Sequence, residues 1–455
     1  MDTSELAFAG IARQAESIRE GAVSAAELVD LYLERIERLD PELNAFRVVF
    51  AERARAEAAQ ADARLKAGEE RPLLGVPVAV KDNLNVAGEV TAMGTNAYGG
   101  PATADSEVVR RLRAAGAIVI GKTHMSELAI FPFTESLAWG QTRNPWDRGR
   151  SPGGSSGGSG TAVAAGLVGA GYASDGGGSI RIPASVAGLF GLKPQRGRVP
   201  LLPDPEHWYG LSSGGGLTRS VLDTALWLDV VADSERPFVD AARSEPGRLR
   251  VALSFKPTAI TRIDPRVRAA VERVADALRS LGHDVVERDP DYGEIAPLFL
   301  PRWLVGIRDD VRALPHPERL EKRTRQLARL GALVGNGGVR RARAAEEART
   351  RRIGAIFDDV DVLLTPTLPA PPDRLGRFAD RSLATTIALV AGMVCFTQVW
   401  NVTGQPAASI PAPVAHGDLP IGAQLVSRPG DEATLLSLAA QLERELGWLE
   451  RRPPV

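Results

Sequence analysis

Two short apolar segments with a helical segment between them limit most strongly what this chain can fold into. VPVAVKDN (76–83) and AIVIGKT (117–123) are rich in β-branched residues and bounded by glycine, as expected of buried strands. EVVRRLRAAGA (107–117), which lies between them, has the pattern of a helix. A strand, a helix and a second strand in this order are typical of parallel pairing. The sequence therefore predicts an α/β protein.

Two glycine-rich stretches place serines on a bare backbone. SPGGSSGGSG covers 151–160 and ASDGGGSIRIP covers 173–183. Neither contains G-x-x-x-x-G-K-[ST], or G-x-G-x-x-G with an acidic residue after a following strand, so a nucleotide-binding loop is not indicated. Residues 154–158 match G-x-S-x-G around Ser156. A nucleophile elbow needs a strand directly before it, however, and SPGG does not have the pattern of a strand.

Lys81 stands at the end of the first predicted strand. The chain has six lysines against 49 arginines, so a lysine in an apolar strand suggests a property that arginine lacks. A buried lysine can lose its proton near neutral pH, whereas arginine effectively never does. The alternative is a salt bridge from Lys81 to a nearby acid such as Asp82. The histidines lie in segments typical of loops or strand ends and are weak candidates for a base: His124, His207, His283, His316 and His416.

Acyl transfer would account for these features together. A serine hydroxyl needs a base to become a nucleophile, and the tetrahedral intermediate needs donors directed at its oxygen. N–H groups of successive glycines beside a helix start can converge on such an oxygen. This predicts Ser179 as the nucleophile, with an oxyanion hole formed by Gly176, Gly177, Gly178 and Ser179. A tight turn without chemistry accounts poorly for three glycines followed by serine.

Composition favours a small-molecule partner. The net charge of −1 offers no general field for nucleic acid, and 44% hydrophobic with 24% charged residues is typical of a globular protein. Cys395, the single cysteine, excludes intrachain disulfides and cysteine-rich metal sites, and its apolar surroundings predict a buried structural thiol. The first residues lack a signal-peptide pattern and no run of about 18 apolar residues occurs, which predicts a cytoplasmic protein without membrane contact.

Several motifs together resemble the amidase signature family of serine hydrolases. GVPVAVKDN, SPGGSSGGSG and SDGGGSIRIPASVAGLFGLKP follow one another in this order, and with GKTHMSEL, RNPWD, LTRSVLD, NVTGQPAASIP and LPIGAQLV they cover most of the chain. The resemblance implies a Ser-cisSer-Lys triad. In it, Lys81 is the base, Ser155 the bridging serine whose peptide bond is typically cis, and Ser179, 24 positions later, the nucleophile. The resemblance also implies supporting roles for three residues close in sequence to the two serines: Ser156, Asp175 and Arg181.

The resemblance also implies a fold. We expect a single large α/β/α unit with a mixed central sheet of about eleven strands covered by helices. Within residues 1–455 we expect N-terminal helices (1–70), the catalytic signature core (71–200), a variable, helix-rich substrate-side region (201–380) and a C-terminal return to the core (381–455). Neither a cofactor nor a metal is expected. Two departures from the usual family pattern are His124 in GKTH, where many members have GKTN, and ASDGGGS in place of GTDTGGS.

The predicted reaction is hydrolysis of a linear carboxamide to a carboxylic acid and ammonia or an amine. The alternative is the ammonia-releasing subunit of a glutamine-dependent aminoacyl-tRNA amidotransferase. Only segment 302–352 favours it, with 14 Lys or Arg against 6 Asp or Glu, and such runs are usually solvated helical faces. A non-catalytic protein on the same scaffold would lack a member of the triad, and none is missing.

The predicted partner is a small-molecule amide, with no nucleic acid, and the family suggests a possible homodimer. Aromatic residues in segments that could approach the site favour an apolar or aryl substrate group: Phe131, Phe133, Trp139, Trp208 and Tyr209.

Overall fold

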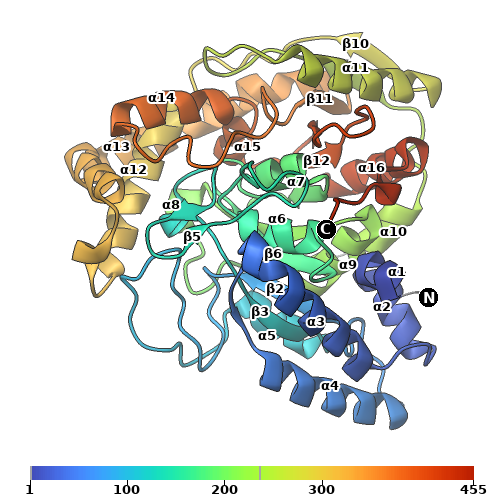
Figure 1. The fold of residues 1–455 in the computed structure, drawn as a ribbon. Helices are drawn as coiled ribbons and strands as arrows, with labels where there is room; N and C mark the ends of the chain where they lie inside the picture. Colours follow the sequence, from blue (N-terminus) through green and yellow to red (C-terminus); the bar gives the residue numbers. More distant parts are fainter. Residues whose placement is uncertain (1–2, 235–236) are drawn as a thin grey trace.

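The computed structural model describes residues 3–234 and 237–455, and a mixed sheet of 11 strands forms its centre (Figure 1). The pairs β2–β3, β2–β6, β9–β10 and β9–β11 are parallel, and the other neighbours are antiparallel. This confirms the predicted α/β fold and the parallel pairing of the two apolar segments. Across the sheet the strands are β1 (Phe46–Val49), β3 (Ile118–Thr123), β2 (Pro77–Lys81), β6 (Ala170–Asp175), β8 (Ser213–Thr218), β7 (Phe190–Lys193), β12 (Ala407–Pro411), β13 (Gly422–Ser427), β11 (Val362–Pro366), β9 (Arg250–Leu253) and β10 (Asp284–Glu287).

Helices surround the sheet, and a separate two-stranded ribbon pairs β4 (Glu135–Ser136) with β5 (Gly140–Gln141). The α-helices are α1 (Thr3–Phe8), α2 (Gly10–Arg19), α3 (Ala25–Leu43), α4 (Ala51–Lys66), α5 (Glu107–Ala114), α6 (Gly157–Ala164), α7 (Arg181–Ala187), α8 (His207–Gly210), α9 (Val221–Val231), α10 (Phe238–Arg243), α11 (Pro265–Ser280), α12 (Ala296–Ala313), α13 (Lys322–Gly354), α14 (Leu383–Met393), α15 (Gln398–Thr403) and α16 (Glu432–Leu446).

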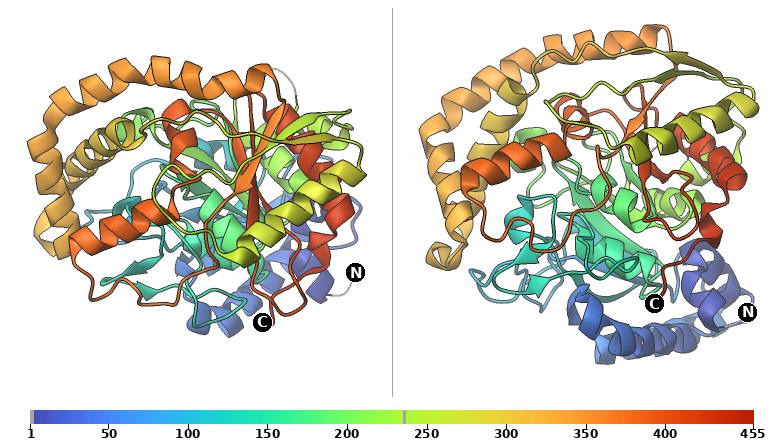
Figure 2. Two further views of the ribbon diagram at one scale, coloured as in Figure 1. Left: turned by 90° about the horizontal axis from the view of Figure 1, so that it is seen from above. Right: turned by 45° about the horizontal axis from the view of Figure 1, so that its top comes forward.

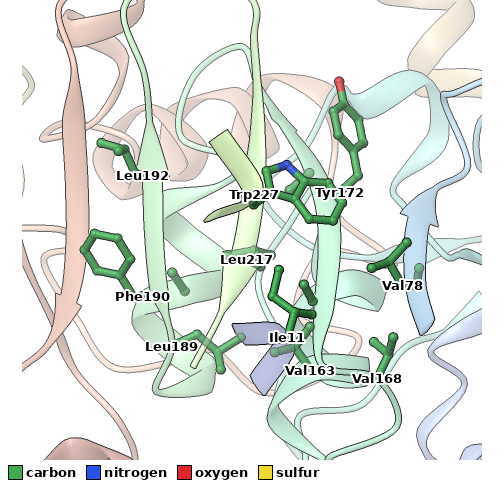
Figure 3. Packing of buried hydrophobic residues seen from close by; sticks show 14 of the residues in the cluster. Ile11, Val78, Val163, Val168, Tyr172, Leu189, Phe190, Leu192, Leu217 and Trp227 are labelled. Carbon is green, nitrogen blue, oxygen red and sulfur yellow. The ribbon is translucent and has the colours of Figure 1, made fainter. Parts of the chain in front are cut away.

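Alternate side chains of the strands enter two different hydrophobic clusters. On β11, Leu363 packs with residues of α12 and α13, whereas Val362 and Leu364 pack with residues of α11 and α16. Successive side chains of a strand point to opposite faces, so the clusters are the cores of the two faces and the layers are helix, sheet, helix. Figure 3 shows part of the larger cluster, where Trp227 of α9 lies beside the strand that carries Leu217.

The N-terminal region contains a strand in addition to the expected helices. β1 (Phe46–Val49) pairs antiparallel with β3 at the edge of the sheet. The prediction that residues 1–70 are helical is therefore corrected for this segment. Its sequence, FRVV, combines aromatic and β-branched residues, which suit the pleated surface of a sheet.

The basic segment 302–352 forms most of α12 and α13, which lie together at one side of the molecule in both views of Figure 2. Several of its arginines are bonded within the chain. Arg302 is buried, with Nη1 3.0 Å from Glu346 Oε2, and it also donates to the Tyr209 carbonyl. Arg349 donates to the Tyr292 carbonyl at 2.9 Å. These bonds explain part of the charge run without an anionic partner.

Two further observations concern the rest of the chain. Cys395 is buried, and burial raises the pKa of its thiol to about 12, as expected of a structural cysteine. None of the helices in the described residues combines the length and the apolar character needed to cross a membrane.

Candidate active site

The parallel pairing of β2 and β6 brings the site together. Lys81 is the last residue of β2, while Ser174 and Asp175 are the last residues of β6. Because the strands are parallel neighbours, their carboxyl ends lie at the same edge of the sheet. That edge is where ligands bind in open α/β sheets.

Lys81 is fully buried between two serine hydroxyls. Its Nζ lies 2.7 Å from Ser155 Oγ and 2.8 Å from Ser174 Oγ. Asn83 Nδ2 donates to the same Ser174 oxygen at 3.2 Å. Burial lowers the pKa of Lys81 to about 7, although the nearby Asp175 carboxylate acts to raise it. The lysine side chain can therefore be neutral near physiological pH, and Ser155 is in hydrogen-bonding contact with it.

The loop that carries Ser155 is packed too tightly for larger residues. The Gly154–Ser155 peptide bond is cis. A Cβ on Gly154 would lie 2.6 Å from the Phe133 backbone nitrogen, which explains the glycine. Ser156 follows as the residue before α6, and its Oγ donates to the Ser174 carbonyl at 3.3 Å. The loop is thereby fixed to the end of β6.

The glycine run is braced by a buried ion pair. Asp175 Oδ1 accepts the Gly178 N–H at 2.7 Å. Both carboxylate oxygens are also 2.9 Å from Arg181 nitrogens, and Asp175 and Arg181 are both fully buried. Asn401 Nδ2 donates to Asp175 Oδ1 at 2.8 Å, while Asn401 Oδ1 accepts from Arg181. Burial alone would raise the pKa of Asp175, but Arg181 and Asn401 outweigh this effect and hold that pKa well below its usual range.

This brace changes the set of amides available to an oxyanion. The Gly178 N–H is already used by Asp175, and Gly178 has φ +136°, which disfavours any other residue. Within residues 3–234 and 237–455, no hydrogen bond occupies the N–H of Gly176, Gly177 or Ser179. Of the four residues predicted for the oxyanion hole, Gly178 therefore has its amide occupied, whereas Gly176, Gly177 and Ser179 have amides without a protein partner.

Ser179 is half-buried and lines a cavity. Apart from Ser179 and Gln398, the lining side chains are apolar or aromatic and include Phe131, Trp208 and Phe299. The cavity volume is about 70 Å³. The serine therefore faces a narrow, mainly apolar space.

Two aromatic residues predicted for the pocket lie elsewhere. Trp139 Nε1 donates to the Thr95 carbonyl at 3.0 Å, and Tyr209 Oη donates to Asp309 at 2.6 Å. Neither lines the cavity beside Ser179, so their assignment to it is corrected. Phe133 is buried in a stack with its ring centroid 5.1 Å from that of Phe131.

Comparison with known proteins identifies the family. The model of the family described as Amidase matches residues 27–436. The chain belongs to the amidase family. "Putative amidase AmiB2" of Mycobacterium tuberculosis is 54% identical over 461 residues, with 100% of both chains covered. The 6-aminohexanoate-cyclic-dimer hydrolase of Paenarthrobacter ureafaciens is 35% identical over 492 residues, which cover 97% of this chain and 95% of that protein.

Solved structures agree with this assignment. The structure of 6-aminohexanoate cyclic dimer hydrolase complexed with substrate has a TM-score of 0.91 at 32% identity, and the match covers 98% of this chain and 99% of that one. The family and these relatives support amide hydrolysis as the activity of the chain. They give no support to the tRNA amidotransferase alternative. This amidase therefore matches the family that the motifs resemble.

His124 directly follows β3 in this amidase. Its ring is 6.0 Å from that of Trp139, and its backbone N–H donates to the Ala45 carbonyl. Burial, with a contribution from Arg47, lowers the pKa of His124 to about 4, so the ring is neutral near pH 7. Among the described residues, no group of three or more His, Cys, Asp or Glu is placed to hold a metal ion.

Several polar residues at the site are missing from the sequence-based assignment, among them Ser174, Asn401 and Gln398. Ser174 directly precedes Asp175 in ASDGGGS, so its contact with Lys81 could have been inferred from the parallel strands. Asn401 and Gln398 come from α15, more than 200 positions after the glycine run. No local pattern connects α15 with that run.

The brace predicts a loss of stability when one partner is removed. Arg181→Ala would leave the Asp175 carboxylate buried without its guanidinium, and we expect the free energy of unfolding to fall by about 3–5 kcal/mol. Arg13→Ala is the matched control, because Arg13 pairs with Glu16 on the surface, where solvent screens the pair and the expected loss is much smaller. Denaturant unfolding of both variants measures the difference. Equal losses of unfolding free energy in the two variants would contradict a stabilising role of the Asp175–Arg181 pair.

Proposed function

We propose that this amidase cleaves amides through an ester formed on Ser179, with Lys81 and Ser155 as the proton relay. One observation carries the proposal, namely the 2.7 Å contact between Lys81 Nζ and Ser155 Oγ in a fully buried setting. A neutral lysine can accept a proton, and burial favours the neutral form. A base in contact with a serine is the arrangement that activates a serine nucleophile.

The proposed first half-reaction forms the ester. Lys81 accepts the Ser155 hydroxyl proton while Ser155 accepts the Ser179 proton, and Ser179 Oγ bonds to the amide carbon. The resulting oxyanion accepts hydrogen bonds from the N–H groups of Gly176, Gly177 and Ser179. As the C–N bond breaks, the proton returns through Ser155 to the leaving nitrogen. Ammonia or an amine departs, and the acyl group stays on Ser179.

The second half-reaction returns the enzyme to its starting state. Water gives one proton to the Ser155–Lys81 relay, and its oxygen bonds to the ester carbon. The bond to Ser179 Oγ then breaks, and the relay returns the proton to that oxygen. The products are a carboxylic acid and free Ser179. Ser174, which is 2.8 Å from Lys81, would hold the amine in place throughout.

For the substrate, we propose a linear amide with an apolar or aryl group in the cavity. The lining, which is apolar or aromatic except for Ser179 and Gln398, favours a neutral, apolar group. A cyclic amide is the second candidate, because a relative with 35% identity is named 6-aminohexanoate-cyclic-dimer hydrolase.

A panel of amides tests this function. The purified chain is incubated with linear aliphatic, aryl and amino-acid amides and with cyclic amides, and the release of ammonia or amine is followed. We expect steady release over many turnovers from linear apolar amides without added proteins. Release that needs partner subunits and charged tRNA would contradict the proposal. Preference for the cyclic compounds would favour the second candidate.

The pH profile follows from the lysine. Lys81 must be neutral to accept a proton, and its pKa is lowered to about 7, so kcat/KM should rise with pH through about 7 and level off above it. Initial rates at low substrate concentration, measured from about pH 5 to 9, report the free enzyme. A rate that first rises near the usual pKa of a lysine would contradict a lowered Lys81 pKa.

A further inference from the structure

Gln398 introduces an amide into the otherwise apolar cavity beside Ser179. It begins α15, directly after Thr397, whose Oγ1 donates to the Gly177 carbonyl at 2.7 Å. Among the described residues that line the cavity, only Ser179 and Gln398 have a side-chain hydrogen-bond acceptor. None of these lining residues is charged. The cavity is therefore suited to a neutral group.

The Gln398 amide is far from satisfied within the chain. A glutamine side chain offers two N–H donors and one carbonyl acceptor. Only one contact of this amide is formed in the described residues, a long one of 3.4 Å from Nε2 to Thr258 Oγ1. Thr258 Oγ1 itself donates to the Cys395 carbonyl. Gln398 is 8% exposed, and its side-chain carbonyl has no hydrogen-bond partner in the described residues and stays in contact with solvent.

Unsatisfied polar groups in an apolar pocket favour a ligand that completes their hydrogen bonds. A ligand that displaces solvent from such a group without pairing with it leaves the group unsatisfied, so the pocket discriminates against ligands that cannot pair with it. The free carbonyl requires a donor, and the free N–H requires an acceptor. A second amide in the substrate supplies both and carries no charge.

We propose that Gln398 selects substrates that carry a second, uncleaved amide, which pairs with its side chain while Ser179 attacks the first. The inference rests on the proposed function. It narrows the substrate class to neutral compounds with two amides separated by an apolar spacer. Gln398 is then a specificity residue, distinct from the groups that move protons.

Matched pairs of anilides test this proposal. Each pair consists of an ω-acetamidoalkanoyl anilide and its ketone twin, in which a methylene replaces the acetamide N–H, and the pairs form a series of spacer lengths. Aniline release gives kcat/KM, and calorimetry on Ser179→Ala gives the binding constants without turnover. At the spacer length that fits the cavity, we expect kcat/KM and the binding constant to be about tenfold higher for the acetamide than for its ketone twin. Such a ratio corresponds to one net hydrogen bond.

Substitution of the glutamine gives the deciding comparison. Gln398→Met keeps the length of the side chain but removes the amide, and the preference should fall to about one in both measurements. Gln60→Met, on the exposed face of α4, is the control and should keep the preference. A preference that persists in Gln398→Met, or that is absent at every length, would overturn the proposal. Binding preference without any aniline release would support Gln398 and count against the proposed function.

Discussion

Ser179→Ala is expected to lower kcat/KM for amide hydrolysis by at least about 10⁴-fold, because it removes the only protein atom proposed to bond to the carbonyl carbon. Residual turnover would come from binding and from the amides of the glycine run. The measurement is amine release from the best substrate of the panel, with thermal unfolding as a check that the variant is folded. Ser179 lines the cavity and has no structural hydrogen bond in the described residues, so stability should change little.

Ser156→Ala is the matched control for this variant. Ser156 is also a serine in a glycine-rich loop, but its hydroxyl donates to the Ser174 carbonyl. Ser156→Ala should therefore lower kcat/KM much less than Ser179→Ala does. Equal losses in the two variants would contradict the assignment of Ser179 as the nucleophile.

Lys81→Met should lower kcat by about 10³-fold or more, because the relay loses its base. Methionine resembles the stem of a neutral lysine and is suited to the buried position. The rise of the rate through about pH 7 should disappear with the lysine. Lys81→Arg should not restore activity, since a guanidinium effectively never gives up its proton. The rates of both variants across the pH range provide the measurement.

Lys66→Met, at the exposed end of α4, is the control for the lysine variants and should keep the activity. If Lys81→Met kept nearly full activity while Ser179→Ala lost it, the relay would be wrong. A histidine base would then have to be considered again. His124, whose pKa is lowered to about 4, would be a weak base for that role.

The parts of the site that sequence predicts best lie on adjacent elements of the chain. Lys81 ends a strand whose apolar pattern is clear, and parallel pairing brings the ends of β2 and β6 together. The number of strands was expected only from the resemblance, since short buried strands such as β9 and β11 come from segments without a distinctive motif. Regular patterns therefore predicted the framework of the site.

Side-chain directions and long-range contacts were not predictable in the same way. Trp139 and Tyr209 are close in sequence to site residues, but hydrogen bonds to Thr95 and Asp309 hold them away from the cavity. The use of the Gly178 amide by Asp175 depends on the conformation of the turn. Gln398 reaches the cavity through tertiary packing of α15, which no local periodicity encodes.

Three expectations stay predictions. They are the division of residues 1–455 into four regions, apart from the strand found in 1–70, a possible homodimer and a cytoplasmic location. A non-catalytic role conflicts with the contact between Lys81 and Ser155 and with the family. Labelling of folded protein by a serine-directed fluorophosphonate distinguishes an amidase from a non-catalytic protein. The amidase should form an adduct on Ser179, whereas a non-catalytic protein would form none.

The most direct test of the acyl-enzyme is to trap it and locate it. The chain is mixed with an activated ester of a simple apolar acid, quenched with acid within the first turnover and digested for mass spectrometry. The proposed mechanism predicts one acyl group, which fragmentation of the peptide 151–181 locates at Ser179, and none in Ser179→Ala. An acyl group on Ser155 or Ser156, or its persistence in Ser179→Ala, would contradict it.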